Sequence, residues 1–176
     1  MAKQKRRSYL DDFQRDVSGE YHYKGAHYRY AGAMDYRKLR RRLWLCAAPG
    51  AGMVLAAGCL PGATVGAAWY VTLPYMAALL AAGIALWTLA QWSRGGMTLR
   101  AYVYAKTVRR MPGEFLTAAI FAALAAAGQG STILFENSSN FSKLANFFLL
   151  FVAVFLNMRA FVLAKRTSYD FIDANK

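Results

Sequence analysis

The sequence predicts an all-α membrane protein, a bundle of four transmembrane helices whose N and C termini both lie in the cytoplasm. Apolar and aromatic residues make up 57% of the 176 residues, yet the formal net charge is +13. The charges are concentrated in compact basic segments, and the apolar residues form long uncharged runs. This segregation is typical of membrane proteins rather than of soluble domains.

Four uncharged runs define the predicted spans. A helix needs about 20 residues to cross a hydrocarbon layer of about 30 Å, and the runs are close to that length or exceed it. Pro49 in the first run and Pro74 in the second are compatible with kinked membrane helices. We therefore expect a transmembrane domain over residues 43–164, with spans at about 43–60, 67–92, 115–135 and 145–164.

The positions of Lys and Arg predict the orientation of the bundle. Of the 22 basic residues, 20 fall in the N-terminal segment 1–42, the loop between the second and third spans, or the tail 165–176. Lys143 is the one basic residue in the opposite loops, and Arg159 lies inside a span. The positive-inside rule places the basic segments in the cytoplasm. Anionic lipid headgroups are then the expected partner of this charge, and nucleic acid is not an expected partner.

The N-terminal segment 1–42 contains a Tyr-rich stretch that predicts a small β-hairpin. Tyrosines alternate with polar residues on both sides of a plausible turn at residues 24–27. Three interpretations remain open: an amphipathic element at the membrane interface, a docking surface for a partner, or a ligand or metal site at His22 and His27. The four tyrosines expected to share one face are Tyr21, Tyr23, Tyr28 and Tyr30.

Capping residues predict where two helices begin. Asp35 suits the N-cap of a helix that enters the bilayer after Arg42. In the loop between the second and third spans, Gly95-Gly96 ends one helix and Thr98 can cap another, which ends at Met111-Pro112-Gly113. We expect this short helix to lie on the cytoplasmic membrane surface, with coupling to a partner as the alternative.

Polar residues inside the spans fall on helix faces made of small residues. Asn146 and Asn157 share a stripe of the fourth span with small apolar residues, and Gln129 ends a stripe of alanines on the third span. Such faces pack against other helices, and amides on them form interhelical hydrogen bonds. The opposite stripe of the fourth span is bulky and should face lipid or a partner subunit; its members are Phe148, Phe151, Phe155, Arg159 and Val162.

Arg159 is the one charge inside a predicted span. It lies about 8 Å from the cytoplasmic end of the helix, so its guanidinium can reach the headgroups by snorkelling. Its place on the bulky stripe favours that interpretation. A contact with another subunit and a role toward a substrate or ion are the two alternatives.

The residue types expected of catalysis or cofactor binding are missing from the predicted spans. They contain no Asp, Glu or His, and Cys46 and Cys59 are too far apart on one helix for a disulfide. We therefore expect no enzyme, no cofactor and no metal. The prediction is a non-catalytic accessory, regulatory or assembly subunit of a complex in the bacterial inner membrane, which contacts another membrane protein or a second copy of itself. A small oligomeric solute transporter or channel is the alternative.

Overall fold

The computed structural model describes residues 13–15, 21–23, 27–60, 68–135 and 141–172, and in the first two of these stretches the backbone alone. The described chain is mostly helical, with short strands toward both of its ends and between the second and third long helices. In chain order the elements are β1 (Phe13–Arg15), β2 (Tyr21–Tyr23), β3 (His27–Tyr30), α2 (Tyr36–Cys59), α3 (Trp69–Gly95), β4 (Thr98–Arg100), α4 (Ala101–Lys106), α5 (Met111–Phe135), α6 (Phe141–Lys165) and β5 (Tyr169–Ile172).

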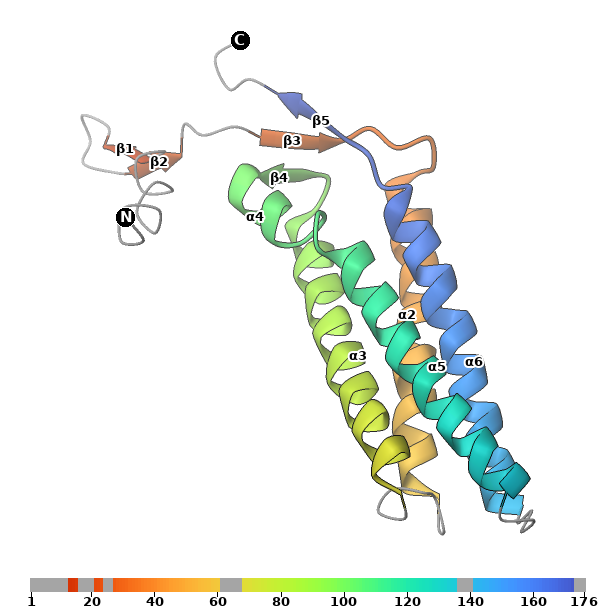
Figure 1. Cartoon of the computed structure of the whole chain (residues 1–176). Helices are drawn as coiled ribbons and strands as arrows, with labels where there is room; N and C mark the ends of the chain where they lie inside the picture. Colours follow the sequence, from red (N-terminus) through yellow and green to blue (C-terminus); the bar gives the residue numbers. More distant parts are fainter. Residues whose placement is uncertain (1–12, 16–20, 24–26, 61–67, 136–140, 173–176) are drawn as a thin grey trace.

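Among the described residues four helices are long and apolar enough to cross a membrane, namely α2, α3, α5 and α6. Successive helices run antiparallel and pack against each other, and α6 closes the bundle by packing on α2 (Figure 1). The four helices coincide with the predicted spans within a few residues, except that α2 begins well before its predicted span. The prediction of a four-helix bundle of membrane-spanning length is therefore confirmed.

Small residues form the contacts between helices, and large apolar residues cover the outside. Alanines spaced at one helical face are buried on α3 and on α5, which lets these two helices approach closely. Large side chains such as Leu80, Trp87 and Phe148 are more than half exposed. A surface of this kind suits a hydrocarbon surrounding rather than water.

The two stripes predicted for α6 have the expected environments. Its buried residues are Asn146, Leu150, Ala153, Asn157, Ala160 and Ala164. Phe148, Phe151 and Phe155 on the opposite side are 65%, 60% and 58% exposed. The helix period alone was enough to assign the inner face, because the alanines and asparagines recur on one side and the bulky residues on the other.

The predicted hairpin within residues 21–30 is wrong in its pairing. β2 pairs with β1, whereas β3 is the central strand of a separate antiparallel sheet with the order β4-β3-β5. This sheet lies at one end of the bundle and joins three segments that are far apart in the sequence (Figure 1). Residues 24–26 of the predicted turn lie outside the described residues. The alternation of tyrosine with polar residues predicted the strands correctly. It does not indicate which distant strand each of them pairs with.

The predicted surface helix between the second and third spans is also corrected. The segment Thr98–Arg100 is a strand, and the helix α4 that follows has six residues. Gly96, at a φ of 74°, ends α3 and turns the chain so that the next residues run beside β3. Met111, Pro112 and Gly113 begin α5 instead of ending a helix. A proline is tolerated there because the first N–H groups of a helix have no intrahelical partner.

Replacing Gly58 should test the close packing of α2 on α3. A Cβ at Gly58 would collide with the hydroxyl of Tyr75, which donates a hydrogen bond of 3.1 Å to the Val54 carbonyl. We expect Gly58→Ala to lower the stability of the bundle by about 1–3 kcal/mol, measured as thermal unfolding in detergent. Gly52→Ala is the matched control, since open space surrounds Gly52 on the same helix. Equal melting of the two variants would contradict this packing.

Candidate functional site

The three-stranded sheet has one face toward the helices and one face outward. Residues paired directly across antiparallel strands share a face, and the register pairs Tyr28 with Leu99 and with Phe171. Leu99 is buried, whereas Arg29 and Arg100 on the alternate positions are exposed. The sheet is therefore amphipathic, with Leu99 and the tyrosines directed toward the bundle and Arg29 and Arg100 on the outer face.

The inner face of the sheet forms a continuous aromatic cluster with residues from the helices. The rings of Tyr28 and Tyr104 are stacked with centroids 4.3 Å apart, and Tyr36 of α2 lies 5.1 Å from Trp92 of α3. Edge-to-face contacts of 5.5–5.7 Å connect the others, in the arrangement that aromatic pairs favour. We call this set the aromatic cap; it comprises Tyr28, Tyr30, Tyr36, Trp92, Tyr104, Tyr169 and Phe171.

Hydrogen bonds engage polar side-chain atoms of Trp92, Tyr169 and Tyr30 in the aromatic cap. Trp92 donates its indole N–H to the hydroxyl of Tyr169 over 2.7 Å, which ties β5 to α3. Tyr30 donates its hydroxyl to the Met34 carbonyl, also at 2.7 Å. Because a buried polar group without a partner is costly, these bonds favour one orientation of the three rings that form them.

Burial shifts the ionisation of two tyrosines that lie outside the helices. It raises the pKa of Tyr169, against the opposing effect of the hydrogen bond from Trp92. It also raises the pKa of Tyr30, and the charge of Asp35 acts in the same direction. In both cases an apolar or negative surrounding disfavours the phenolate. The folded cap therefore holds both phenols in the neutral form.

The edge of the sheet formed by β5 remains open among the described residues. β5 has β3 on one side and no other strand on its outer side. Phe171 is 59% exposed and Ile172 is 39% exposed, although both lie in a strand of four residues. An exposed edge strand with apolar side chains can pair with another chain.

The structure brings together only part of the predicted Tyr/His segment. Tyr28 and Tyr30 lie in the aromatic cap, whereas Tyr21 and Tyr23 belong to β2, where the backbone alone is described. His27 lies in β3 and His22 in β2, on strands of different sheets. Within the described residues no group of three His, Cys, Asp or Glu side chains could hold a metal.

The buried amides of the bundle have different partners from one another. Asn146 of α6 donates to the Ala57 carbonyl of α2 over 3.1 Å, which is an interhelical hydrogen bond as predicted. Asn157 donates to the Ala153 carbonyl of its own helix over 2.9 Å, and the interhelical bond expected of it stays a prediction. Its amide instead packs closely against Gly50. Gln129 is fully buried on the inner face of α5.

Arg159 is exposed on the outer face of α6, on the stripe predicted for it. Its guanidinium carbon lies 5.8 Å from the centroid of the Phe155 ring, within the range of a cation–π contact. The side chain therefore lies on the outer surface of the bundle and not among the buried amides.

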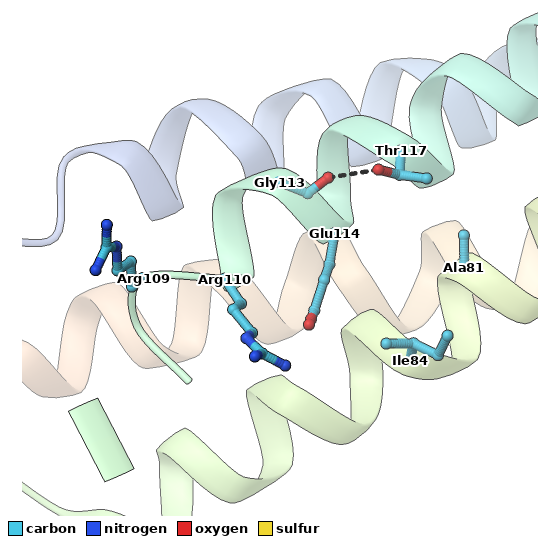
Figure 2. A pocket seen from close by; sticks show the side chains of 7 residues that line it. All are labelled: Ala81, Ile84, Arg109, Arg110, Gly113, Glu114 and Thr117. Atoms are coloured by element: carbon cyan, nitrogen blue, oxygen red, sulfur yellow. Dashed lines mark hydrogen bonds between the residues drawn. The ribbon is translucent and has the colours of Figure 1, made fainter. Parts of the chain in front are cut away.

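Glu114 is a polar residue in a long helix that the sequence prediction missed. It lies in the first turn of α5, because that helix begins four residues before the predicted start of the span. Its Oε2 atom is buried and has no hydrogen-bond partner among the described residues. The side chains of Glu114 and Arg110 extend toward α3, beside a cavity of about 360 Å³ (Figure 2). The side chain of Arg109 points away from α3. Pro112 could have indicated the earlier start of this helix, because proline is common in the first turn of a helix.

Comparisons with protein-family models, with curated proteins and with solved structures find no match for this chain. The class of protein is therefore defined by the fold alone. Four helices of spanning length in the described residues fit a multi-pass membrane protein. A small sheet lies at one end of the bundle (Figure 1), and the rings of the aromatic cap join this sheet to α2 and α3.

The neutral tyrosines of the cap predict a loss of its structure at alkaline pH. An unfolded tyrosine loses its proton at about pH 10, whereas Tyr169 and Tyr30 have raised pKa values in the folded cap. Their contribution to stability is complete below about pH 10 and falls as the pH rises further. We expect the near-ultraviolet circular dichroism of the cap to be lost in this range, while the far-ultraviolet signal of the helices persists.

A variant without the most strongly shifted phenol provides the control for this titration. Tyr169→Phe keeps the ring but removes the ionisable group and the acceptor for Trp92. We expect its cap to be less stable at neutral pH and its alkaline transition to be weaker. An alkaline transition identical to that of the unchanged protein would contradict the assignment.

Proposed function

We propose that this chain is a non-catalytic integral membrane protein, an accessory, regulatory or assembly subunit of a complex in the bacterial inner membrane. In this proposal the sheet and both termini are in the cytoplasm. The three basic segments support that orientation, because they all adjoin the end of the bundle that carries the sheet. Lys143 adjoins the other end, so the positive-inside rule favours one orientation strongly.

The open edge of β5 is the observation that carries the proposal. Tyr30 donates its main-chain N–H to Met97 on the β4 side, at 3.0 Å, whereas Ala31 donates to Ser168 on the β5 side, at 3.1 Å. Main-chain groups alternate in direction along an antiparallel strand. The main-chain N–H and carbonyl groups of Arg29 and Asp170 therefore point toward each other. The main-chain N–H and carbonyl of Phe171 point away from the sheet. These outward groups are available to a further strand.

The chemistry around this edge indicates what kind of segment would bind there. An added strand gains main-chain hydrogen bonds at Phe171 and apolar contacts with the exposed side chains of Phe171 and Ile172. The outer face of the sheet carries Arg29 and Arg100, with Asp170 opposite Arg29, and the adjoining segments add further basic residues. We therefore propose an extended segment of another subunit, with acidic residues beside its apolar ones, as the partner.

The proposal predicts that a proline at position 171 prevents association. Phe171→Pro removes the outward N–H but leaves the residues that pair with β3 in place. Loss of one main-chain hydrogen bond and of the ring contact should weaken association by about tenfold or more. The measurement is quantitative recovery of co-purifying subunits in mild detergent from cells that express the full chain at its natural level.

Phe171→Thr is the matched control, because it removes the ring but keeps the N–H in a residue that favours strands. We expect association of the threonine variant to be closer to that of the unchanged protein than to that of the proline variant. A lone monomer under native conditions, or equal recovery for all variants, would overturn the proposal.

One observation favours the alternative of a small oligomeric transporter or channel. Coupled transporters carry buried carboxylates within their spans, and Glu114 has a buried oxygen beside a cavity between α3 and α5. Arg110 and Thr88 adjoin it. The amides of Asn146 and Asn157 argue the other way, because each already donates to a backbone carbonyl. We therefore keep transport as the second candidate.

Proton flux into liposomes distinguishes the two candidates. The full chain is reconstituted in vesicles that contain a pH-sensitive dye, and a membrane potential is imposed. We expect no flux above that of empty vesicles, in agreement with an accessory subunit. Flux that is present in the unchanged protein and in Glu114→Asp, but lost in Glu114→Gln, would replace our first proposal by the second.

A further inference from the structure

A groove between α2 and α6 brings together two arginines on the outer surface of the bundle. The groove has a volume of about 450 Å³ and is lined by Arg42, Leu45, Cys46, Leu156, Arg159 and Leu163. The two arginines come from different helices, and both are exposed. Three leucines and a cysteine form the remaining walls. The groove thus combines two positive charges with an apolar lining.

The two arginines lie at a similar depth along their helices. Arg42 is six residues from the first residue of α2, and Arg159 is six residues from the last residue of α6. The helices are antiparallel, so these two ends lie at the same side, and both arginines are about 9 Å inside it. This is the depth at which an arginine side chain meets the phosphates of the nearer leaflet.

No carboxylate balances this charge inside the groove. The lining residues include no Asp or Glu. Arg159 also has a cation–π contact with the Phe155 ring, which is not a negatively charged partner. Two guanidiniums at one opening match the several oxygens of a phosphodiester, which accept charge-assisted hydrogen bonds.

From this geometry we propose that the groove is a specific binding site for one anionic phospholipid of the cytoplasmic leaflet. Arg42 and Arg159 hold the headgroup phosphate from two sides. The acyl chains extend along the leucines, toward the middle of the bilayer. Basic pockets between transmembrane helices recognise lipid headgroups in this way. The proposal does not depend on the accessory function, because it concerns a different surface from the β5 edge, but it rests on the proposed orientation of the bundle.

Lipid retention by the purified full chain tests the site. The protein is delipidated in detergent, mixed with phosphatidylglycerol or with phosphatidylcholine, and the bound lipid is counted by native mass spectrometry. We expect one phosphatidylglycerol to be retained in preference to phosphatidylcholine. The double variant R42Q/R159Q should lower the affinity for phosphatidylglycerol by about tenfold or more, since each arginine contributes to the binding of anionic lipid.

Two sets of controls separate this site from general attraction to charge. R41Q removes the same charge from the neighbouring position, which does not line the groove, and should leave retention unchanged. R42K/R159K keeps the charge and should recover part of the binding. Inorganic phosphate should not displace the lipid, because it lacks the apolar contacts. Equal retention by R42Q/R159Q and R41Q, or displacement by phosphate, would overturn the proposal.

Cys46 provides a readout that does not require changing the arginines. It lines the groove, whereas Cys59 is exposed at the far end of α2, and both are free. In a Cys59→Ser protein, phosphatidylglycerol should slow the reaction of Cys46 with a maleimide several times more than phosphatidylcholine does. Equal rates would contradict the site. Protection that depends on protein concentration without added lipid would assign the groove to a subunit interface instead, and would also overturn the proposal.

Discussion

The short strand His27–Tyr30 is the element on which the end of the bundle depends. A strand of four residues is far too short to persist alone, and its main-chain groups need partners on both sides. It finds them in Thr98–Arg100 and Tyr169–Ile172, which the four antiparallel helices bring to the same end. The bundle therefore creates the sheet by position, and the sheet in turn holds together the N-terminal segment, the middle loop and the tail.

The aromatic cap connects the sheet to the helices α2 and α3. Tyr36 and Trp92 belong to α2 and α3, and their rings contact those of the sheet. One further bond, from the Trp44 indole to the Ser93 hydroxyl at 2.9 Å, joins the same two helices beside the cap. Tyrosine and tryptophan suit this place, because each has a large apolar ring and one polar atom that must find a partner. The cap is thus both an apolar contact and a set of oriented hydrogen bonds.

The helices below the cap divide their surfaces by side-chain size rather than by polarity. Lipid solvates large apolar side chains well, so burial follows from close packing of small residues and from a few polar groups such as Asn146. The charged outer positions have to be explained separately. Arg42 and Arg159 lie on the outer surface at one depth, and that shared depth is what gives two exposed arginines a common role in our proposal.

The sequence by itself determined the features that depend on local composition and period. Hydrophobic runs of sufficient length predicted the four helices, and the spacing of small residues predicted the buried side of α6, because both signals repeat within one helix. The partners of the strands were decided only by tertiary structure. Tyr28 could equally have packed against Tyr21 or Tyr23 from its own alternation, but its neighbours are Tyr104 and Phe171, more than 70 residues further on. The same holds for Arg159, whose groove requires Arg42 from another helix. Pairing across such distances depends on which ends the bundle brings together, and no short-range pattern contains that information.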